Sequence, residues 1–228
     1  MNARLSLIAS LIAPGVGFVD VGTDHGYLPA HMAQKDYTGR IIASDIRPAP
    51  LSTAVATARE ADVEDKISFR LCDGLDGVAP DEVDTLVIAG MGGDTISGIL
   101  DRAEWCMDSR YLLLLQPMTK AEILRYWLVN NGFELVGEYL VRDAGEVYQL
   151  ISARFGGVTE LMDAELFSGR FELLRDEPLF PGQISLLIRR FERALSGLER
   201  AKRPMHCREV YKDILDGLYQ MKKELDAQ

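Results

Sequence analysis

The feature that most constrains this 228-residue chain is a regular alternation of short β-branched runs with helical stretches between residues 18 and 154. An alternation of this kind gives a mostly parallel sheet with right-handed crossovers, so we expect an α/β fold. Strands are predicted at residues 18–22, 40–44, 67–72, 83–89 and 111–116, and helices at residues 27–34, 49–61, 95–103 and 120–131.

Two further β-branched runs follow this repeat. They cover residues 133–141 and 146–155, and only residues 142–145, which include Gly145, separate them. A connection this short, with a glycine that can adopt positive φ, is typical of a hairpin. An antiparallel pair is therefore expected to close an otherwise parallel sheet.

The character of the sequence changes after Gly156-Gly157. No β-branched run follows, and the remaining residues have a helical pattern with one breaker at residues 176–182. Apolar residues recur at three- and four-residue steps over residues 184–198 and again over residues 210–225. We predict two antiparallel helices that turn near residues 202–204.

Composition excludes several classes of protein. The chain is 47% hydrophobic and 26% charged, which is the composition of an ordinary globular protein. This composition excludes a disordered chain and a small scaffold held together by disulfides. No stretch reaches the about 18 apolar residues of a membrane span. Cys72, Cys106 and Cys207 are odd in number and lack C-x-x-C spacing, which favours a reducing cytoplasm and no metal site.

An apolar run near the start, residues 5–13 after Arg4, has the length of a signal-peptide core. Its apolar residues recur at helical steps, and it leads directly into the first predicted strand. We therefore interpret it as an amphipathic helix packed on the sheet.

A glycine-bearing turn follows the first predicted strand, over residues 20–27 with the sequence DVGTDHGY. Such a turn lets backbone approach a ligand closely, and the next helix offers free N–H groups at its start. Asp45, 19 residues after Gly26, ends the second strand, where a carboxylate can accept hydrogen bonds from both hydroxyls of a ribose. A nucleotide-like cofactor is predicted; the alternative is that Asp20, Asp24 and Asp45 are helix caps or loop acids.

Departures from the dinucleotide fingerprint G-x-G-x-x-G narrow the choice of cofactor. That pattern needs glycine at positions 24 and 27, where this chain has Asp24 and Tyr27, so a pyrophosphate would meet a carboxylate. A cofactor without phosphates and with a positive centre suits an acidic loop better. S-adenosylmethionine, which has a ribose for Asp45 and a sulfonium and an ammonium for Asp20 and Asp24, is therefore the predicted cofactor.

Two later segments extend the predicted site. After the third strand, Asp73 is placed to accept from an adenine amino group while Leu75 packs on the ring; a plain turn is the alternative. After the fourth strand, the glycines of residues 90–93 offer an open floor for a planar base, unless they serve only tight strand-to-helix packing. The predicted cofactor-binding residues are Asp20, Gly22, Thr23, Asp24, His25, Gly26, Asp45, Ile46, Asp73, Gly74, Leu75 and Gly90.

The chain resembles the bacterial TrmK-type tRNA methyltransferases in residues 20–29, 45–46, 73–75, 90–93 and 115–118, with Trp127-Leu128. The resemblance covers residues 4–154 and implies methylation of N1 of the adenosine at tRNA position 22. It also implies a class I (Rossmann-like) methyltransferase domain with a seven-stranded sheet, residues 1–154, and a helical, coiled-coil-like domain, residues 155–228. Residues 46–50 depart from the Gly-Pro pair expected near the cofactor's ribose, so the geometry of that loop is expected to differ.

This function gives roles to the residues around the glycine floor. Because N1 of adenine has its own lone pair, catalysis is mainly positioning, and no side-chain nucleophile is needed. The base must leave its stack and be held against an aromatic or apolar surface, for which we predict Tyr27 and Met91. Backbone carbonyls of residues 89–92, Gln116 and Asp24 would stabilise the cationic product ring. The predicted catalytic residues are Asp24, Tyr27, Met91, Gly92 and Gln116.

The net charge of −10 argues against a polyanionic partner until it is divided along the chain. Residues 1–154 have 13 Lys+Arg and 22 Asp+Glu, a net of −9, whereas residues 155–228 have 12 and 13, a net of −1. Residues 188–208 have seven basic and two acidic residues, a net of +5, and we predict that they bind tRNA phosphates; a solvated helix face is the alternative. The predicted RNA-binding residues are Arg189, Arg190, Arg193, Arg200, Lys202 and Arg203.

Other functions fit the same residues. The negative charge favours a methyltransferase for a small molecule or a protein, and a non-catalytic RNA-binding scaffold could retain the cofactor pocket as structure. A nicotinamide-dependent dehydrogenase is disfavoured by Asp24 and Tyr27. The sequence leaves the tRNA species open, as well as the choice between a monomer and a weak dimer.

Overall fold

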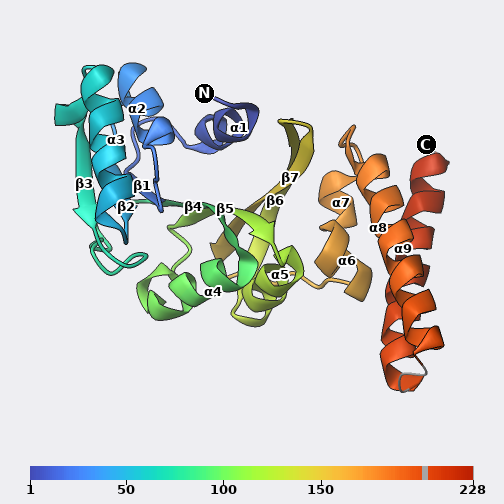
Figure 1. Cartoon of the computed structure of the whole chain (residues 1–228). Coiled ribbons are helices and arrows are strands. Elements are labelled where there is room, and N and C mark those ends of the chain that lie inside the picture. Colours follow the sequence, from blue (N-terminus) through green and yellow to red (C-terminus); the bar gives the residue numbers. More distant parts are fainter. Residues whose placement is uncertain (202–204, 228) are drawn as a thin grey trace. The chain divides into compact units, whose positions relative to one another are not determined.

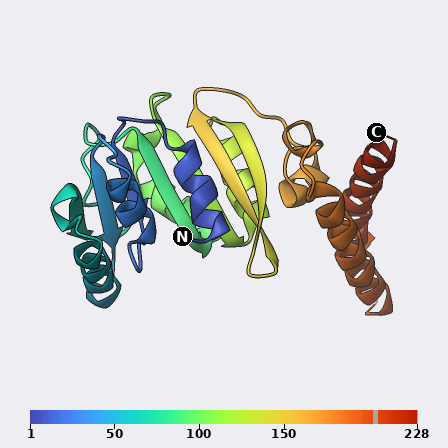
Figure 2. The same ribbon diagram turned by 90° about the horizontal axis from the view of Figure 1, so that it is seen from above.

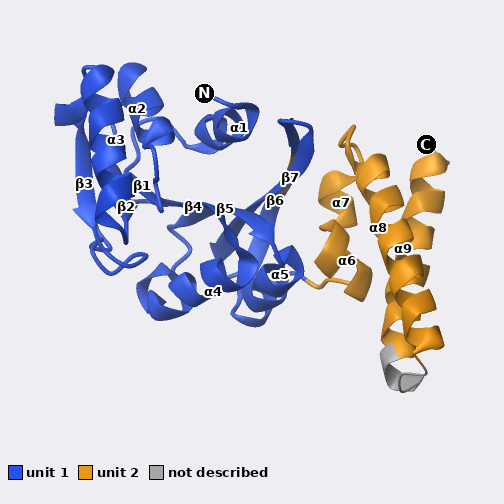
Figure 3. Ribbon diagram, in the orientation of Figure 1, with its two compact units in different colours: residues 1–137, 141–159 blue, residues 138–140, 160–228 orange. Residues whose placement is uncertain are grey.

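The computed structural model describes residues 1–201 and 205–227, with the backbone alone for residues 205–207. The chain forms two compact units (Figure 3). Unit 1 contains Met1–Gly137 and Val141–Thr159, and unit 2 contains Glu138–Leu140 and Glu160–Gln228. The predicted boundary, between residues 154 and 155, lies shortly before Thr159, where unit 1 ends, and the prediction did not include Glu138–Leu140 in the second unit.

Unit 1 is a seven-stranded sheet with helices on both faces (Figures 1 and 2). The strands are β1 (Phe18–Val21), β2 (Ile41–Asp45), β3 (Ile67–Leu71), β4 (Thr85–Gly92), β5 (Leu112–Thr119), β6 (Phe133–Asp143) and β7 (Glu146–Phe155). The helices are α1 (Ala3–Leu11), α2 (Tyr27–Gln34), α3 (Pro48–Glu60), α4 (Gly93–Arg102) and α5 (Ala121–Asn130), with short 3-10 turns η1 (Glu64–Lys66) and η2 (Glu104–Cys106).

The strand order is β3-β2-β1-β4-β5-β7-β6. The strands from β3 to β5 pair in parallel, and β7 runs antiparallel to β5. The turn between β6 and β7 uses positive φ at Ala144 (48°) and Gly145 (88°), a conformation that glycine adopts at little cost. The predicted α/β class, with an antiparallel hairpin closing a parallel sheet, is confirmed.

The core of unit 1 lies on both faces of the parallel strands. Val19, Ile42, Leu86 and Leu114 have no exposed side-chain surface, because helices cover the sheet on each side: α1 and α2 on one face, α4 and α5 on the other (Figure 2). Strands buried on both faces need continuous apolar runs, and that is the pattern the sequence shows.

The strands β4 and β5 extend further than their apolar runs predict. Their pairing continues through register shifts between Ala89 and Met91 and between Met91 and Gly92, opposite Pro117 and Thr119. An extra residue in one strand bends the ladder without ending it. The strand therefore passes through the glycine segment instead of stopping before it.

Unit 2 includes four helices among its described residues: α6 (Asp163–Ser168), α7 (Phe171–Leu174), α8 (Phe180–Arg200) and α9 (Met205–Asp226). The two long helices lie side by side (Figures 1 and 2), with Ile184, Ile188, Leu218 and Met221 buried. The turn predicted near residues 202–204 lies outside the described residues.

The break predicted at residues 176–182 is shorter in the structure, because α8 already begins at Phe180. Pro181 occupies the first turn of this helix, where a backbone N–H has no partner within the helix, so its absence costs little. In the described part of the chain, no helix is both long and apolar enough to cross a bilayer.

Candidate active site

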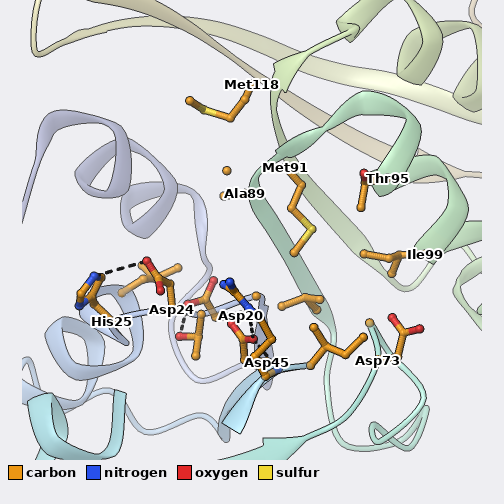
Figure 4. A pocket seen from close by; sticks show the side chains of 18 of the residues that line it. Asp20, Asp24, His25, Asp45, Asp73, Ala89, Met91, Thr95, Ile99 and Met118 are labelled. Carbon is orange, nitrogen blue, oxygen red and sulfur yellow. Dashed lines mark hydrogen bonds and ion pairs between the residues drawn. The ribbon is translucent and has the colours of Figure 1, made fainter. Parts of the chain in front are cut away.

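A cavity of about 750 Å³ lies in unit 1 at the carboxyl ends of the parallel strands (Figure 4). Its lining comes from the segments that follow β1, β2 and β3, from the end of β4, and from α1 and α4. The structure brings most of the predicted site residues together there: Asp20, Gly22, Thr23, Asp24, His25, Tyr27, Asp45, Ile46, Asp73, Gly74, Gly90 and Met91 line it.

The turn after β1 depends on residues with positive φ. Gly22 (70°), Asp24 (51°) and Gly26 (68°) all adopt it, and a Cβ on Gly26 would lie 3.0 Å from the backbone of Ala54. The amides of Gly22 and Thr23 both donate to the carbonyl of Ser44, at 2.8 and 2.9 Å. The turn is thereby fixed to the end of β2, beside Asp45.

Two carboxylates lie buried beneath this turn. Asp20 is 7% exposed and Asp45 is 4% exposed. Burial, together with the charge on Asp45, raises the pKa of Asp20 to about 7, even though the hydroxyl of Thr23, which donates to Asp20 at 2.7 Å, opposes the shift. A buried carboxylate with a raised pKa gains from a cationic ligand, which replaces the solvation it has lost.

The backbone amide of Arg47 donates to Asp45 Oδ1 at 2.8 Å. This bond fixes one carboxylate oxygen of Asp45 and leaves the other available for a ligand, because a carboxylate accepts up to four hydrogen bonds.

Asp73 lies at the other end of the cavity from Asp24 in Figure 4, with Asp20 and Asp45 between them. Arg102 on α4 pairs with Asp73 at 2.9 Å. Leu75 is 2% exposed and does not line the cavity, which is lined near Gly74 by Ile99 of α4. An apolar contact to an adenine ring is therefore available from Ile99.

Tyr27 and His25 form a stacked pair on the cavity wall. Their ring centroids are 5.3 Å apart with an interplanar angle of 12°, and Asp24 lies 3.5 Å from the His25 ring nitrogen. Tyr27 remains 53% exposed. A half-exposed ring that already stacks on one neighbour offers its surface to another planar group.

The glycines at the end of β4 have different roles. A Cβ on Gly93 would lie 2.1 Å from the carbonyl oxygen of Lys120, so Gly93 serves strand-to-helix packing. Gly90 has a φ of 80°, and among the described residues only Arg4 Nη1, at 4.0 Å, lies near the position of a Cβ. The floor next to Gly90 is therefore open, as a site for a ligand requires.

Four of the predicted cofactor-binding and catalytic residues do not line the cavity: Gly26, Leu75, Gly92 and Gln116. Gly26 is the N-cap of α2 and Gly92 that of α4. Gln116 is fully buried, and its side-chain oxygen accepts from Arg4 at 2.8 Å. The catalytic roles given to Gly92 and Gln116 stay predictions.

Several residues that line the cavity were not predicted from the sequence. Thr95, Gly98, Ile99 and Arg102 come from one face of α4, and their spacing of three and four residues is the signal that could have identified them once the glycine floor was placed before this helix. Arg4, on α1, also lines the cavity, and no local pattern marks it.

In the described part of the chain, no cluster of three or more His, Cys, Asp or Glu side chains is arranged to hold a metal ion. Cys72 and Cys106 are free thiols.

The predicted RNA-binding residues belong to unit 2. Arg189, Arg190, Arg193 and Arg200 are exposed on α8, and none of them forms an ion pair with another described residue. Lys202 and Arg203 lie outside the described residues. Unpaired exposed arginines at helical spacing form a surface that phosphates can bind.

Comparisons with known proteins agree with this geometry. Residues 1–151 match the family model described as a methyltransferase domain. The tRNA (adenine(22)-N(1))-methyltransferase of Bacillus subtilis (strain 168) is 31% identical over 156 residues, which is 68% of this chain and 66% of that protein.

Two solved structures resemble the chain over nearly its whole length. The crystal structure of the B. subtilis m1A22 tRNA methyltransferase TrmK has a TM-score of 0.82 and 25% identity, covering 99% of this chain and 98% of that one. A Streptococcus pneumoniae protein in complex with S-adenosyl-L-methionine has a TM-score of 0.77 and 28% identity, covering 96% of this chain and 98% of that one. Since the family model spans well over half of its residues, this chain belongs to the methyltransferase domain family.

Proposed function

We propose that this chain is an S-adenosylmethionine-dependent methyltransferase that modifies N1 of adenosine 22 in tRNA. The observation on which the proposal rests is the likeness to the B. subtilis m1A22 tRNA methyltransferase, which extends over 99% of this chain and so includes the helical unit. The sequence match to the same enzyme supports it. Because the proposed substrate is tRNA, we infer a cytoplasmic location.

The residues of the cavity suit S-adenosylmethionine. Asp45 is buried with one oxygen free for ribose hydroxyls, and Asp73 lies beyond it toward β3, where an adenine amino group would donate. Asp20 and Asp24 supply negative charge for the ammonium and sulfonium. Gly90 has no side chain to obstruct a ligand, whereas Met91 Cε fills the space where a side chain on Gly22 would lie. When bound, S-adenosylmethionine supplies an electrophilic methyl group.

The task of the protein is then to position the target base. N1 of adenosine lies on the pairing edge, so the nucleotide must leave its stack at a cost of a few kcal/mol. We infer that the exposed face of Tyr27, backed by His25 at 5.3 Å, stacks on the extruded base and offsets part of this cost. Met91, which also lines the cavity, would form the opposite apolar surface.

Methylation at N1 leaves the adenine ring positively charged. A carboxylate beside the ring stabilises that charge as it develops, and the interaction strengthens where the bound base displaces water from the carboxylate. Asp24, exposed at the rim beside His25, and the carbonyls of residues 89–92 are the groups to which we assign this role.

Binding of the tRNA body is assigned to the arginines of α8. Arg189, Arg193 and Arg200 follow one another at four- and seven-residue steps, so they project from one side of the helix. Contacts to phosphates orient a nucleic acid without reading its sequence. The choice of adenosine 22 would then follow from tRNA shape and from the fit of an adenine in the cavity.

Methylation of defined transcripts tests the proposal. The protein is incubated with labelled S-adenosylmethionine and an unmodified tRNA transcript, or with the same transcript carrying guanosine at position 22. Label in the first transcript alone, with 1-methyladenosine found at position 22 by mass spectrometry, is expected. Equal labelling of both transcripts contradicts the site assignment, and labelling of neither, with cofactor binding shown by calorimetry, favours a small-molecule or protein substrate or a non-catalytic RNA-binding role.

A further inference from the structure

One acid of the cavity has no role in the proposed binding of the cofactor. Asp94 is in the first turn of α4 and lines the cavity. The other acids that line it come from β1, from the end of β2 and from the turns after β1 and β3: Asp20, Asp24, Asp45 and Asp73. In Figure 4, Thr95 and Met118 lie in the upper part of the view, whereas Asp45 and Asp73 lie in the lower part. Among the described residues that line the cavity, Asp94 is therefore the acid that follows β4.

Asp94 is held by Lys120, the residue before α5. Lys120 Nζ donates to Asp94 Oδ2 at 2.5 Å, and both side chains are about half exposed. Lys120 has a φ of 56°, a left-handed conformation that costs energy in any residue with a Cβ and that is often retained at functional sites. Its carbonyl oxygen lies 2.1 Å from the position of a Cβ on Gly93. The backbone and the side chain of Lys120 thus both pack on the start of α4.

This ion pair determines what the carboxylate of Asp94 can do. Lys120 occupies Oδ2, and a Cβ on Gly92 would lie 2.6 Å from Oδ1, so a glycine at position 92 leaves that oxygen its space. The hydrogen bond from Lys120 also holds the pKa of Asp94 below its usual range. At neutral pH the carboxylate is therefore ionised, and it accepts hydrogen bonds but donates none.

Adenine has a hydrogen-bond donor next to the atom that is methylated. Its N6 amino group adjoins N1, whereas guanine has an oxygen acceptor at the same place. An ionised carboxylate accepts from the amino group and repels the oxygen. The cofactor leaves Asp94 free for this role, because Asp45 and Asp73 already match its ribose and its adenine amino group.

We propose that Asp94 accepts a hydrogen bond from N6 of the target adenine and thereby selects adenine over other purines. This inference rests on the proposed function, because it concerns the base that is methylated there. The hydrogen bond strengthens during the reaction, since methylation of N1 gives the ring a positive charge that extends to N6. Lys120 is a positioning residue: it fixes one oxygen of Asp94 and keeps the carboxylate ionised.

Two tRNA transcripts test the inference, one with adenosine and one with purine riboside at position 22. Purine riboside keeps N1 but lacks the N6 amino group, and comparing each variant with the wild type on each transcript cancels the difference in intrinsic reactivity. We expect Asp94→Asn to lower kcat/KM about tenfold with adenosine and less than about twofold with purine riboside. Filter binding with S-adenosylhomocysteine present should show the same selective loss, about fivefold.

Further variants test the role of Lys120 and the position of the acid. Lys120→Ala should show part of the same selective loss, and Lys120→Arg, which keeps the ion pair, should restore the preference for adenosine. Asp101→Asn changes an exposed acid of α4 outside the cavity and is the matched control, for which neither transcript should be affected. Asparagine is also a good residue for the start of a helix, and thermal melting confirms that each variant is folded.

The outcomes separate this inference from the proposed function. If the wild type does not methylate the adenosine transcript, the proposed function itself is wrong. If the wild type does so and Asp94→Asn lowers kcat/KM equally for both transcripts, Asp94 only stabilises the start of α4 and the inference is wrong. An unchanged kcat/KM for both transcripts also overturns it. Loss of affinity for S-adenosylhomocysteine in Asp94→Asn would instead assign Asp94 to the cofactor.

Discussion

Unit 1 and the long helix α8 of unit 2 hold their charges in opposite ways. In unit 1, Asp20 and Asp45 are buried at the cavity. Arg189 and Arg193 on α8 are instead exposed and have no acidic partner among the described residues. Buried acids suit a small cation held at short range, and exposed arginines suit a large anion held through many weak contacts. The net charge of −10 is a sum over the whole chain, and it conceals both an acidic cavity and a basic stretch on α8.

The largest effect on ligand binding is expected at Asp45, one of the two buried acids of the cavity. Asp45→Asn should weaken binding of S-adenosylhomocysteine about 100-fold, because the loss of charge weakens two hydrogen bonds from the ribose hydroxyls. Asparagine still accepts the amide of Arg47, so the loop should stay folded. Asp65→Ala removes an exposed acid of unit 1 outside the cavity and serves as the control; equal loss from both variants in a calorimetric titration would show that general charge, not the site, governs binding.

Charge reversal on α8 should have the next largest effect. The triple variant Arg189→Glu, Arg190→Glu and Arg193→Glu is expected to weaken tRNA binding about 30-fold and to lower its salt dependence, since contacts to phosphates are lost. Cofactor affinity should not change. The variant Lys212→Glu, Lys222→Glu and Lys223→Glu makes the same change in net charge at exposed residues of α9. If filter binding shows the same loss for both variants, RNA binding is not localised to α8.

Tyr27 tests whether the cavity of unit 1 also holds the target base. Tyr27→Ala should lower kcat about tenfold, because one stacking contact with a base is worth about 1–3 kcal/mol, while affinity for S-adenosylhomocysteine stays within about twofold. Tyr126→Ala, which removes a similarly exposed ring outside the cavity, is the matched control. Loss of cofactor affinity in parallel with kcat would make Tyr27 a residue of the cofactor pocket instead.

The smallest effect concerns the pH dependence of cofactor binding. The pKa of Asp20 is raised to about 7 in the free protein, so at lower pH a cationic ligand must displace a proton before it can pair with the carboxylate. Affinity for S-adenosylhomocysteine, through its ammonium, should therefore rise about fourfold from pH 6.5 to pH 8 and then level off.

Asp20→Asn should abolish this pH dependence. In the same variant the free energy of unfolding at pH 8 should increase by up to about 4 kcal/mol, because the wild type ionises Asp20 in a buried site and a raised folded-state pKa makes stability fall as pH rises from about 4 to about 7. A wild-type affinity that does not change with pH would contradict the assignment of Asp20 to the cationic part of the cofactor.

Much of the fold could be predicted because its signals are local. Most parallel strands are short apolar runs, and each of them except β3 is followed by a helix, so the order of elements and the antiparallel hairpin with Gly145 could be read from the pattern. Features that depend on how segments pair were not predicted. The continuation of β4 through Gly90 depends on pairing with β5, and the start of α8 at Phe180 depends on a proline that is harmless only in a first helical turn.

The sequence by itself determined where the acids of the site lie, since Asp45 and Asp73 follow strands whose carboxyl ends must meet at one edge of a parallel sheet. Only the tertiary structure decided which side chains complete the cavity. Ile99, not Leu75, lines it near Gly74, and Arg4 reaches Gln116, 112 positions away in the chain. Contacts of this kind depend on how helices pack across the sheet, and a periodic pattern within one segment contains no information about the partner that another segment supplies.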